Sequence, residues 1–268
     1  MKNALAIFCL LPTLAFAAAK TDKAAPARPF IPGVNWETRT IRATGKAAPS
    51  LKAPSIAAAR IGAEKAAEMD ALRNIMTAVQ GVQLDSETTV GEALSSNGTL
   101  KAQVTGTAKG FRRVDTRYFS DGGVEIDVEM GVEELLADLF PAAEKTQEQV
   151  VLPSAGTPEN TGLIVDAQGL KPTPALAPRL VDEAGKEVYA ASFVGKDAIK
   201  ANGIAGYLKT VEEAKSSARV GAKPLTIKAL RLAGASDLVV SDADAARLRD
   251  PAGNVSFLGE GRVIIVAD

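Results

Sequence analysis

The feature of this chain that most constrains its fold is a long alanine-rich run between Ser55 and Gln80. Serine is a residue type that caps helix N-termini, and Gly81 stands where a left-handed residue commonly ends a helix. Apolar side chains recur along the run at helical spacing, with alanines filling its first half: Ile61, Leu72, Ile75, Met76 and Val79, together with Ala57, Ala58, Ala63, Ala66 and Ala67. Small side chains on a buried face let a helix lie close to a sheet. The run therefore predicts one long helix, ending at about Gln80, packed on strands.

Alternation of apolar and polar residues predicts the strands on which this helix packs. We expect a first strand over 36–45 that stops at Gly45. A three-stranded meander over 100–109, 113–118 and 124–130 follows, and a short closing helix over 132–140. The last two strands are joined by Ser-Asp-Gly-Gly, in which Asp-Gly suits the positive backbone angles of a tight hairpin turn.

A polar, proline-bearing stretch over 141–160 predicts a linker between two domains, 36–140 and 161–268. In the second domain a hairpin is expected to turn at Ala184–Gly185, capping boxes begin at Thr210 and Ser241, and strand patterns occupy 161–167, 224–233, 237–241 and 262–267. The predicted class is α+β: a long Ala-rich helix packed on an antiparallel sheet in the order β-α-β-β-β-α, followed by a second, smaller α+β domain.

The N-terminus has the features of a signal peptide. Met1 and Lys2 give a short positive region, an apolar stretch follows, and Ala15-Phe16-Ala17 is a small-x-small cleavage site, so we expect residues 1–19 to be removed on export. A membrane anchor is the alternative, but the apolar stretch is shorter than the roughly 20 residues a spanning helix needs. Residues 20–35 are expected to form a flexible leader. We therefore predict a periplasmic protein whose mature chain has no transmembrane segment and, since Cys9 is the sole cysteine, no disulfide.

Composition argues against several kinds of function. Lys and Arg total 31 and Asp and Glu total 32, a balance that does not favour nucleic-acid binding. The chain contains no histidine, which removes Ser-His-Asp triads, Cys-His dyads and most transition-metal sites. We predict no catalytic residue, no cofactor-binding residue and no metal ligand.

Two charged groups on the predicted hairpin are nevertheless candidates for binding. Glu125, Asp127 and Glu129 share one strand face, where a hard cation could bind, but facing arginines are expected to pair with them instead. The densest basic cluster comprises Lys109, Arg112, Arg113 and Arg117. It could meet an acidic partner or a lipid headgroup, although neutralisation by the acidic strand is the favoured interpretation. The carboxylates within 165–169 and 241–245 are interpreted as parts of a turn and of a helix cap, respectively. Neither segment has the spacing of acidic ligands that a calcium loop requires.

The stretch from Ile41 to Met130 resembles the exported flagellar outer-membrane lipoprotein family that includes FlgP and, more distantly, FlgT. The resemblance lies in "ATGKA" at 43–47, "AARIGAEKAAEMDALRNIMTAVQGV" at 58–82 and "GTAKGFRRVDTRYFSDGGVEIDVEM" at 106–130. It implies a periplasmic α+β domain that assembles into rings or disks around a flagellar motor beneath the outer membrane. Members commonly have a lipid-modified cysteine after the signal, and this chain does not.

These observations favour a non-enzymatic structural protein, periplasmic or peripheral to the outer membrane. We expect it to be a self-associating subunit of an accessory ring of the flagellar basal body, or of a related envelope assembly, with possible basal-body or outer-membrane protein partners. Sheet edges and the helix over 55–80 would form its interface. The alternative is a soluble periplasmic binding module with a ligand or partner site in the C-terminal half. A hydrolase that relies on carboxylates alone is the least favoured.

Overall fold

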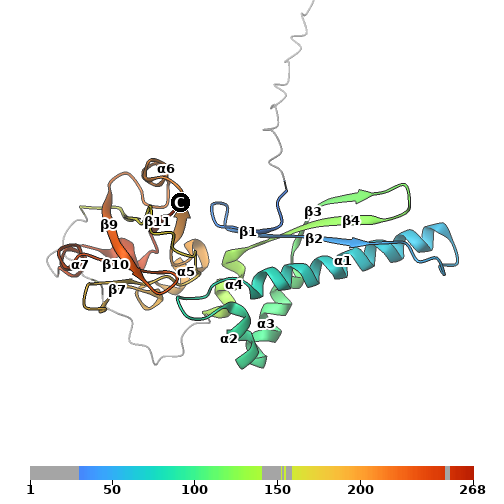
Figure 1. Ribbon diagram of the computed structural model, residues 1–268, viewed down its shortest axis with the longest axis horizontal. Coiled ribbons are helices and arrows are strands. Elements are labelled where there is room, and N and C mark those ends of the chain that lie inside the picture. The colour runs from blue at the N-terminus through green and yellow to red at the C-terminus, as the bar shows by residue number, and fades with distance from the viewer. Residues whose placement is uncertain (1–29, 141–151, 153, 155–158, 251–253) are drawn as a thin grey trace, which may run out of the picture.

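The computed structural model describes residues 30–140, 152, 154, 159–250 and 254–268. It contains two sheets with their associated helices, one formed by each half of the chain, and confirms the predicted α+β class (Figure 1). The predicted signal peptide, most of the predicted leader and most of the predicted linker lie outside the described residues. Among the described helices, none combines the length and apolar character needed to cross a membrane.

The N-terminal half forms a four-stranded antiparallel sheet with the order β1-β2-β4-β3. Its strands are β1 (Gly33–Asn35), β2 (Thr40–Ala47), β3 (Arg112–Tyr118) and β4 (Val124–Gly131). The long helix α1 (Ile56–Gln80) lies along one face of this sheet, over β2 and β4, as Figure 1 shows. As predicted, the helix is capped by Ser55, whose side-chain oxygen accepts a hydrogen bond of 3.1 Å from the Ala58 amide.

Helix α1 approaches β2 closely because both surfaces are made of small residues. Its fully buried residues recur every four positions: Ala63, Ala67, Ala71, Ile75 and Val79. Opposite them, Gly45 lies inside β2, so the prediction that the strand stops at Gly45 is wrong. A Cβ added to Gly45 would lie 2.1 Å from the Ala67 carbonyl oxygen and 2.2 Å from the Ala71 amide nitrogen. Glycine is thus required here by the contact between helix and strand rather than by a turn.

Two details of the predicted helix are also wrong. Ile61 was placed on the buried face but is exposed, because the buried residues form a narrow stripe of alanines instead of the wider apolar face assumed from the sequence. Gly81 follows the helix with φ −77°, in the right-handed region, because its amide continues to bond to the Thr77 and Val79 carbonyls. Glycine is not needed there for its conformational freedom.

The predicted strand over 100–109 is a helix. The structure has α2 (Val90–Ser96) and α3 (Gly98–Lys109) between α1 and the hairpin, so the order β-α-β-β-β-α is not observed. Asn97 caps α3 by accepting a 3.1 Å hydrogen bond from the Leu100 amide. Only Val104 and Ala108 are buried, four residues apart as on a helical face. The alternating residues have the period of a strand, but every second one of them is also four residues from the next, which is the spacing of a helical face, and the N-cap favours the helix.

The beginning of the first predicted strand also differs. The predicted leader over 20–35 includes β1, which pairs with β2 in the antiparallel register Val34–Ile41. Residues 36–39 form the connecting turn, in which Arg39 adopts a left-handed conformation with φ 52°. Strand β2 consequently starts at Thr40, four residues later than the pattern indicated.

The C-terminal half forms a seven-stranded mixed sheet with the order β7-β6-β10-β9-β5-β11-β8. Its strands are β5 (Gly162–Asp166), β6 (Leu180–Val181), β7 (Glu187–Tyr189), β8 (Gly206–Leu208), β9 (Pro224–Ala233), β10 (Asp237–Val240) and β11 (Val263–Val266). Strands β9, β5, β11 and β8 are mutually parallel, and among them β5 and β11 are almost entirely buried. The helical segments are Ala191–Phe193, α5 (Lys196–Asn202), α6 (Val211–Ser216), α7 (Asp242–Arg249) and α8 (Ser256–Gly259). The predicted hairpin at Ala184–Gly185 and the N-caps Thr210 and Ser241 are confirmed.

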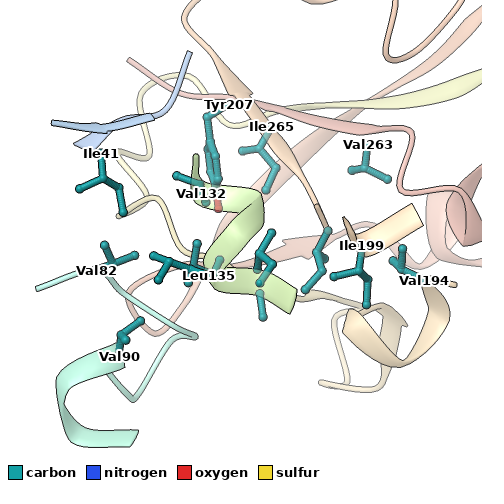
Figure 2. Close-up of a cluster of buried hydrophobic side chains, with 14 of the residues drawn as sticks. Ile41, Val82, Val90, Val132, Leu135, Val194, Ile199, Tyr207, Val263 and Ile265 are labelled. Carbon is teal, nitrogen blue, oxygen red and sulfur yellow. The ribbon is translucent and has the colours of Figure 1, made fainter. Parts of the chain in front are cut away.

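The two halves share a hydrophobic core. Helix α4 (Val132–Leu139), which matches the predicted closing helix, lies between them and packs on α5. Figure 2 shows its Val132 and Leu135 among side chains from both halves, including Ile41 and Val82 on one side and Ile199 and Ile265 on the other. The segment after α1 adds backbone hydrogen bonds, because the Gln83 and Leu84 carbonyls accept from the Leu176 and Ala177 amides at 2.9 and 2.8 Å. The halves are therefore joined by apolar packing and by backbone pairing.

Candidate assembly surface

Strand β3 is an open edge of the N-terminal sheet. Its seven residues are all exposed or half-buried, whereas β4 beside it is largely buried. Among the described residues, the backbone groups of β3 form hydrogen bonds only toward β4. An edge strand of this kind presents unpaired amides and carbonyls to which another strand can pair.

A bulge in β3 decides which side chains lie on which face of the sheet. The register with β4 shifts between Arg113 and Asp115, so Val114 has no direct partner. The shift places Arg113 on the α1 side, where it pairs with Glu64 at 2.7 Å and Glu68 at 3.6 Å. The prediction that Arg113 pairs with the acidic strand is therefore wrong, because the bulge reverses the alternation before Asp115.

The face of the sheet opposite α1 bears a network of ion pairs, as the sequence predicted for its carboxylates. Glu129 receives hydrogen bonds of 2.7 Å from both Arg42 and Arg112. Arg117 contacts Asp127 at 2.6 Å and Glu125 at 3.1 Å. The Thr44 hydroxyl donates to Asp127 at 2.6 Å, and Lys46 pairs with Glu125 at 2.6 Å. We call this set of residues on β2, β3 and β4 the charged ladder.

The charged ladder keeps its carboxylates ionised. Hydrogen bonds from Lys46 and Arg117 lower the pKa of Glu125. Burial raises the pKa of Asp127, but the hydrogen bonds from Arg117 and Thr44 outweigh it, so its pKa is lowered overall. Burial likewise acts on Glu129, and the hydrogen bonds from Arg112 and Arg42 again give a net lowered pKa. Each acid is thus held as an anion by cations that already occupy its oxygens.

The pairing argues for a structural role of these carboxylates rather than a cation site. The described residues contain no cluster of three or more acids, cysteines or histidines arranged to hold a metal ion. Of the predicted basic cluster, Arg112 and Arg117 are neutralised by β4 as expected, and Arg113 by α1. The other carboxylates considered also match their predicted roles: Asp166 accepts from the Gln168 amide in a turn, and Asp244 completes the Ser241 cap.

The opposite edge of the sheet is covered where β1 ends. Beyond its pairing with β1, the backbone of β2 is bonded to side chains of α1: Asn74 donates to the Thr44 carbonyl at 2.9 Å, and Asp70 accepts from the Lys46 amide at 3.0 Å. These contacts occupy backbone groups that would otherwise be free to pair with another strand. The part of β2 that extends beyond β1 is therefore covered by α1, whereas β3 is open.

Exposed apolar side chains lie at the end of the N-terminal half farthest from the C-terminal half, where α1 begins and the β3–β4 hairpin turns (Figure 1). Leu51 and Ile56 are 100% and 91% exposed, and Tyr118 and Phe119 are each 47% exposed. The hairpin turn and the link before α1 meet at Gly122, whose added Cβ would lie 3.1 Å from Pro49. Arg60 stacks on the Tyr118 ring at 4.3 Å. We call Leu51, Ile56, Tyr118 and Phe119 the apolar tip; such patches are typical of interaction sites.

The junction between the halves contains a small crevice of about 10 Å³, enough for about one water molecule. Trp36 and Tyr207 meet edge to face beside it, with ring centroids 5.4 Å apart. Arg39 pairs with Glu133 at 2.8 Å and donates to the Asn202 carbonyl at the end of α5, to which Arg219 also donates. Burial lowers the pKa of Arg219 to about 10. The residues around this crevice connect the two halves, and its volume is too small for a metabolite.

Comparison with known proteins identifies a relative of the C-terminal half. Residues 162–268 match the family defined by the second domain of Treponema pallidum Tp0624. The matched range begins with β5 and includes all seven strands of the C-terminal sheet. It does not include Ile41 to Met130, so it gives no support to the flagellar resemblance. No curated protein matches the chain.

Proposed function

We propose that this chain is a non-enzymatic structural protein of the cell envelope that associates with copies of itself. The observation that supports this proposal best is the difference between the two edges of the N-terminal sheet. Side chains of α1 cover the β2 edge, whereas β3 is left open beside the exposed residues of the apolar tip. Strand pairing and burial of exposed apolar side chains are both common ways in which subunits associate.

The setting we propose is the periplasm, with a possible peripheral position at the outer membrane. The signal-like residues 1–19 favour export, and the resemblance of residues 41–130 to the FlgP and FlgT family favours an accessory ring of the flagellar basal body. A closed ring of more than two copies requires at least two association surfaces on each subunit. The open β3 edge and the apolar tip are two such surfaces.

Sedimentation of the exported protein tests self-association. Over a concentration series we expect oligomers to form as concentration rises and to dissociate on dilution. A matched variant, Ile56→Ser with Phe119→Ser, removes two exposed apolar side chains of the apolar tip and should shift the distribution toward smaller species. A protein that remains monomeric throughout the series contradicts the proposal.

Deletion of the gene tests the flagellar setting separately. We expect cells without the protein to swim poorly and their motors to lack density beneath the outer membrane, with both defects reversed by the wild-type gene. Normal swimming and unchanged motor images would remove the flagellar assignment, while leaving a structural role in another envelope assembly in place.

A further inference from the structure

The open edge of β3 has a self-complementary sequence. Along Val114, Asp115, Thr116, Arg117 and Tyr118 the residue types read apolar, acidic, neutral, basic, apolar. Residues at equal distances on either side of Thr116 therefore match in type: the inner two have opposite charges, and the outer two are apolar. In an antiparallel strand pair, residues at equal distances from a central two-fold axis lie opposite each other.

We propose that β3 pairs antiparallel with β3 of a second copy of this chain, about a two-fold axis at Thr116. This inference rests on the proposed self-association and specifies its contact. In this register Asp115 lies opposite Arg117 of the second copy, twice by symmetry, and Thr116 lies opposite Thr116. The four strands of each copy then form one continuous antiparallel sheet of eight strands.

The observed side chains fit this register. Asp115 and Arg117 both lie on the charged-ladder face, since they stand opposite Asp127 and Glu125 of β4, so they can face each other across a strand pair. The side chains of Asp115 and Arg117 are 55% and 42% exposed and pair with each other at 3.1 Å within the strand, so association would exchange this contact for the equivalent contact between two copies. Val114 and Tyr118, 43% and 47% exposed, lie at the two ends of the paired segment.

Charge selects this register over a neighbouring one. Moving the axis so that Arg112 faces Arg117 of the second copy would place like charges opposite each other twice, which opposes pairing. The axis at Thr116 instead places an acid opposite a base at both symmetric positions. Charge therefore favours the axis at Thr116 over this neighbouring alignment.

Cysteine cross-linking tests both the contact and its register. In a Cys9→Ser background, Thr116→Cys places the two thiols opposite each other across the axis, at a spacing a disulfide can bridge. Under mild oxidation we expect a covalent dimer with Thr116→Cys and little with Asp115→Cys, because Asp115 faces Arg117 and not itself. Thr226→Cys, exposed on β9 of the other half, measures cross-linking by random collision.

A charge variant gives an independent readout. Asp115→Lys places a cation opposite Arg117 of the second copy and should weaken dimerisation about tenfold in sedimentation, since two like-charge pairs replace two opposite-charge pairs. The variant also breaks the exposed Asp115–Arg117 pair within the strand, but exposed pairs contribute little to stability, so the thermal unfolding temperature should change little. A small change in that temperature separates a lost contact from a lost fold.

The outcomes distinguish this inference from the proposed function. If the unmodified protein associates but Thr116→Cys cross-links no better than Thr226→Cys, the β3 contact is wrong and self-association stands. Cross-linking by Asp115→Cys at the rate of Thr116→Cys would overturn the register. A wild-type protein that is monomeric at every concentration overturns both the inference and the proposed function.

Discussion

Gly45 lies directly against the backbone of Ala67, so closely that a Cβ on Gly45 would lie 2.1 Å from the Ala67 carbonyl oxygen. This contact fixes the distance between β2 and α1 in the N-terminal half. It explains why the buried side of α1 is made of alanine where it crosses β2, since larger side chains would separate the two elements.

Gly45→Ala should destabilise the protein by about 3 kcal/mol or more, because the atoms in the way are backbone atoms that cannot move aside cheaply. Urea unfolding measures the loss. Gly62→Ala is the control: Gly62 lies in α1 with nothing within 4 Å of its added Cβ, so alanine should stabilise by about 0.5 to 1 kcal/mol. Equal effects of the two substitutions would contradict the close contact.

Removal of Arg117 should be costly because it leaves Asp127, which is 1% exposed, without its cation. We expect Arg117→Ala to lower the free energy of unfolding by about 2 to 3 kcal/mol, since an unpaired buried charge is strongly unfavourable. The control Arg247→Ala breaks the exposed pair with Asp244 and should cost less than about 0.5 kcal/mol. A loss for Arg117→Ala as small as that of the control would show that Asp127 does not depend on it.

The charged ladder also predicts a loss of stability in acid. The folded state lowers the pKa of Glu125, Asp127 and Glu129, so their contribution to stability is fully present above the ordinary carboxylate range, about pH 4, and is lost as pH falls through the lowered values. Urea midpoints measured at pH 7 and in steps below pH 4 should fall steadily. In Arg117→Ala, Glu125 and Asp127 lose a cation while Glu129 keeps Arg42 and Arg112, so the fall should be shallower but not abolished. An identical pH dependence of the two proteins would exclude Arg117 as a cause.

Local signals in the sequence predicted much of this structure correctly. Ser55 and the alanine run indicated the beginning and end of α1, and the Asp-Gly turn indicated the β3–β4 hairpin, in which Arg117 faces the acids of β4 as predicted and Arg113 does not. These features depend on residues near each other in the chain, where period and capping are informative. The candidate surface was predicted only in outline, as sheet edges and the helix over 55–80.

The errors arose where contacts between distant residues decide the outcome. The alternation over 100–109 has the period of a strand, but Val104 and Ala108 lie four residues apart on the face of a helix that packs on α4 and α1. Asn97 is the one local signal for this helix. The need for glycine at position 45 comes from Ala67, which no local pattern reveals. The coverage of the β2 edge by Asp70 and Asn74 depends in the same way on how α1 lies over the sheet.

The hydrogen bonds by which α1 covers the edge of β2 lead to a prediction about association. In Asp70→Ala with Asn74→Ala, the Lys46 amide and the Thr44 carbonyl lose their partners, and the β2 edge becomes open like that of β3. We expect the variant to lose about 2 kcal/mol of stability, from two hydrogen bonds worth about 1 kcal/mol each. We also expect it to form larger species than the wild type in sedimentation, since two open edges allow strand pairing to continue from copy to copy.

Lys65→Ala is the matched control for this variant, because Lys65 is exposed on the same helix and makes no contact with β2 among the described hydrogen bonds and ion pairs. It should sediment like the wild type. If the double variant does too, despite folding normally, the side chains of α1 are not what prevents association at β2. In that case the difference between the two edges would no longer favour β3 as the surface for self-association, because an uncovered edge would have proved insufficient for pairing.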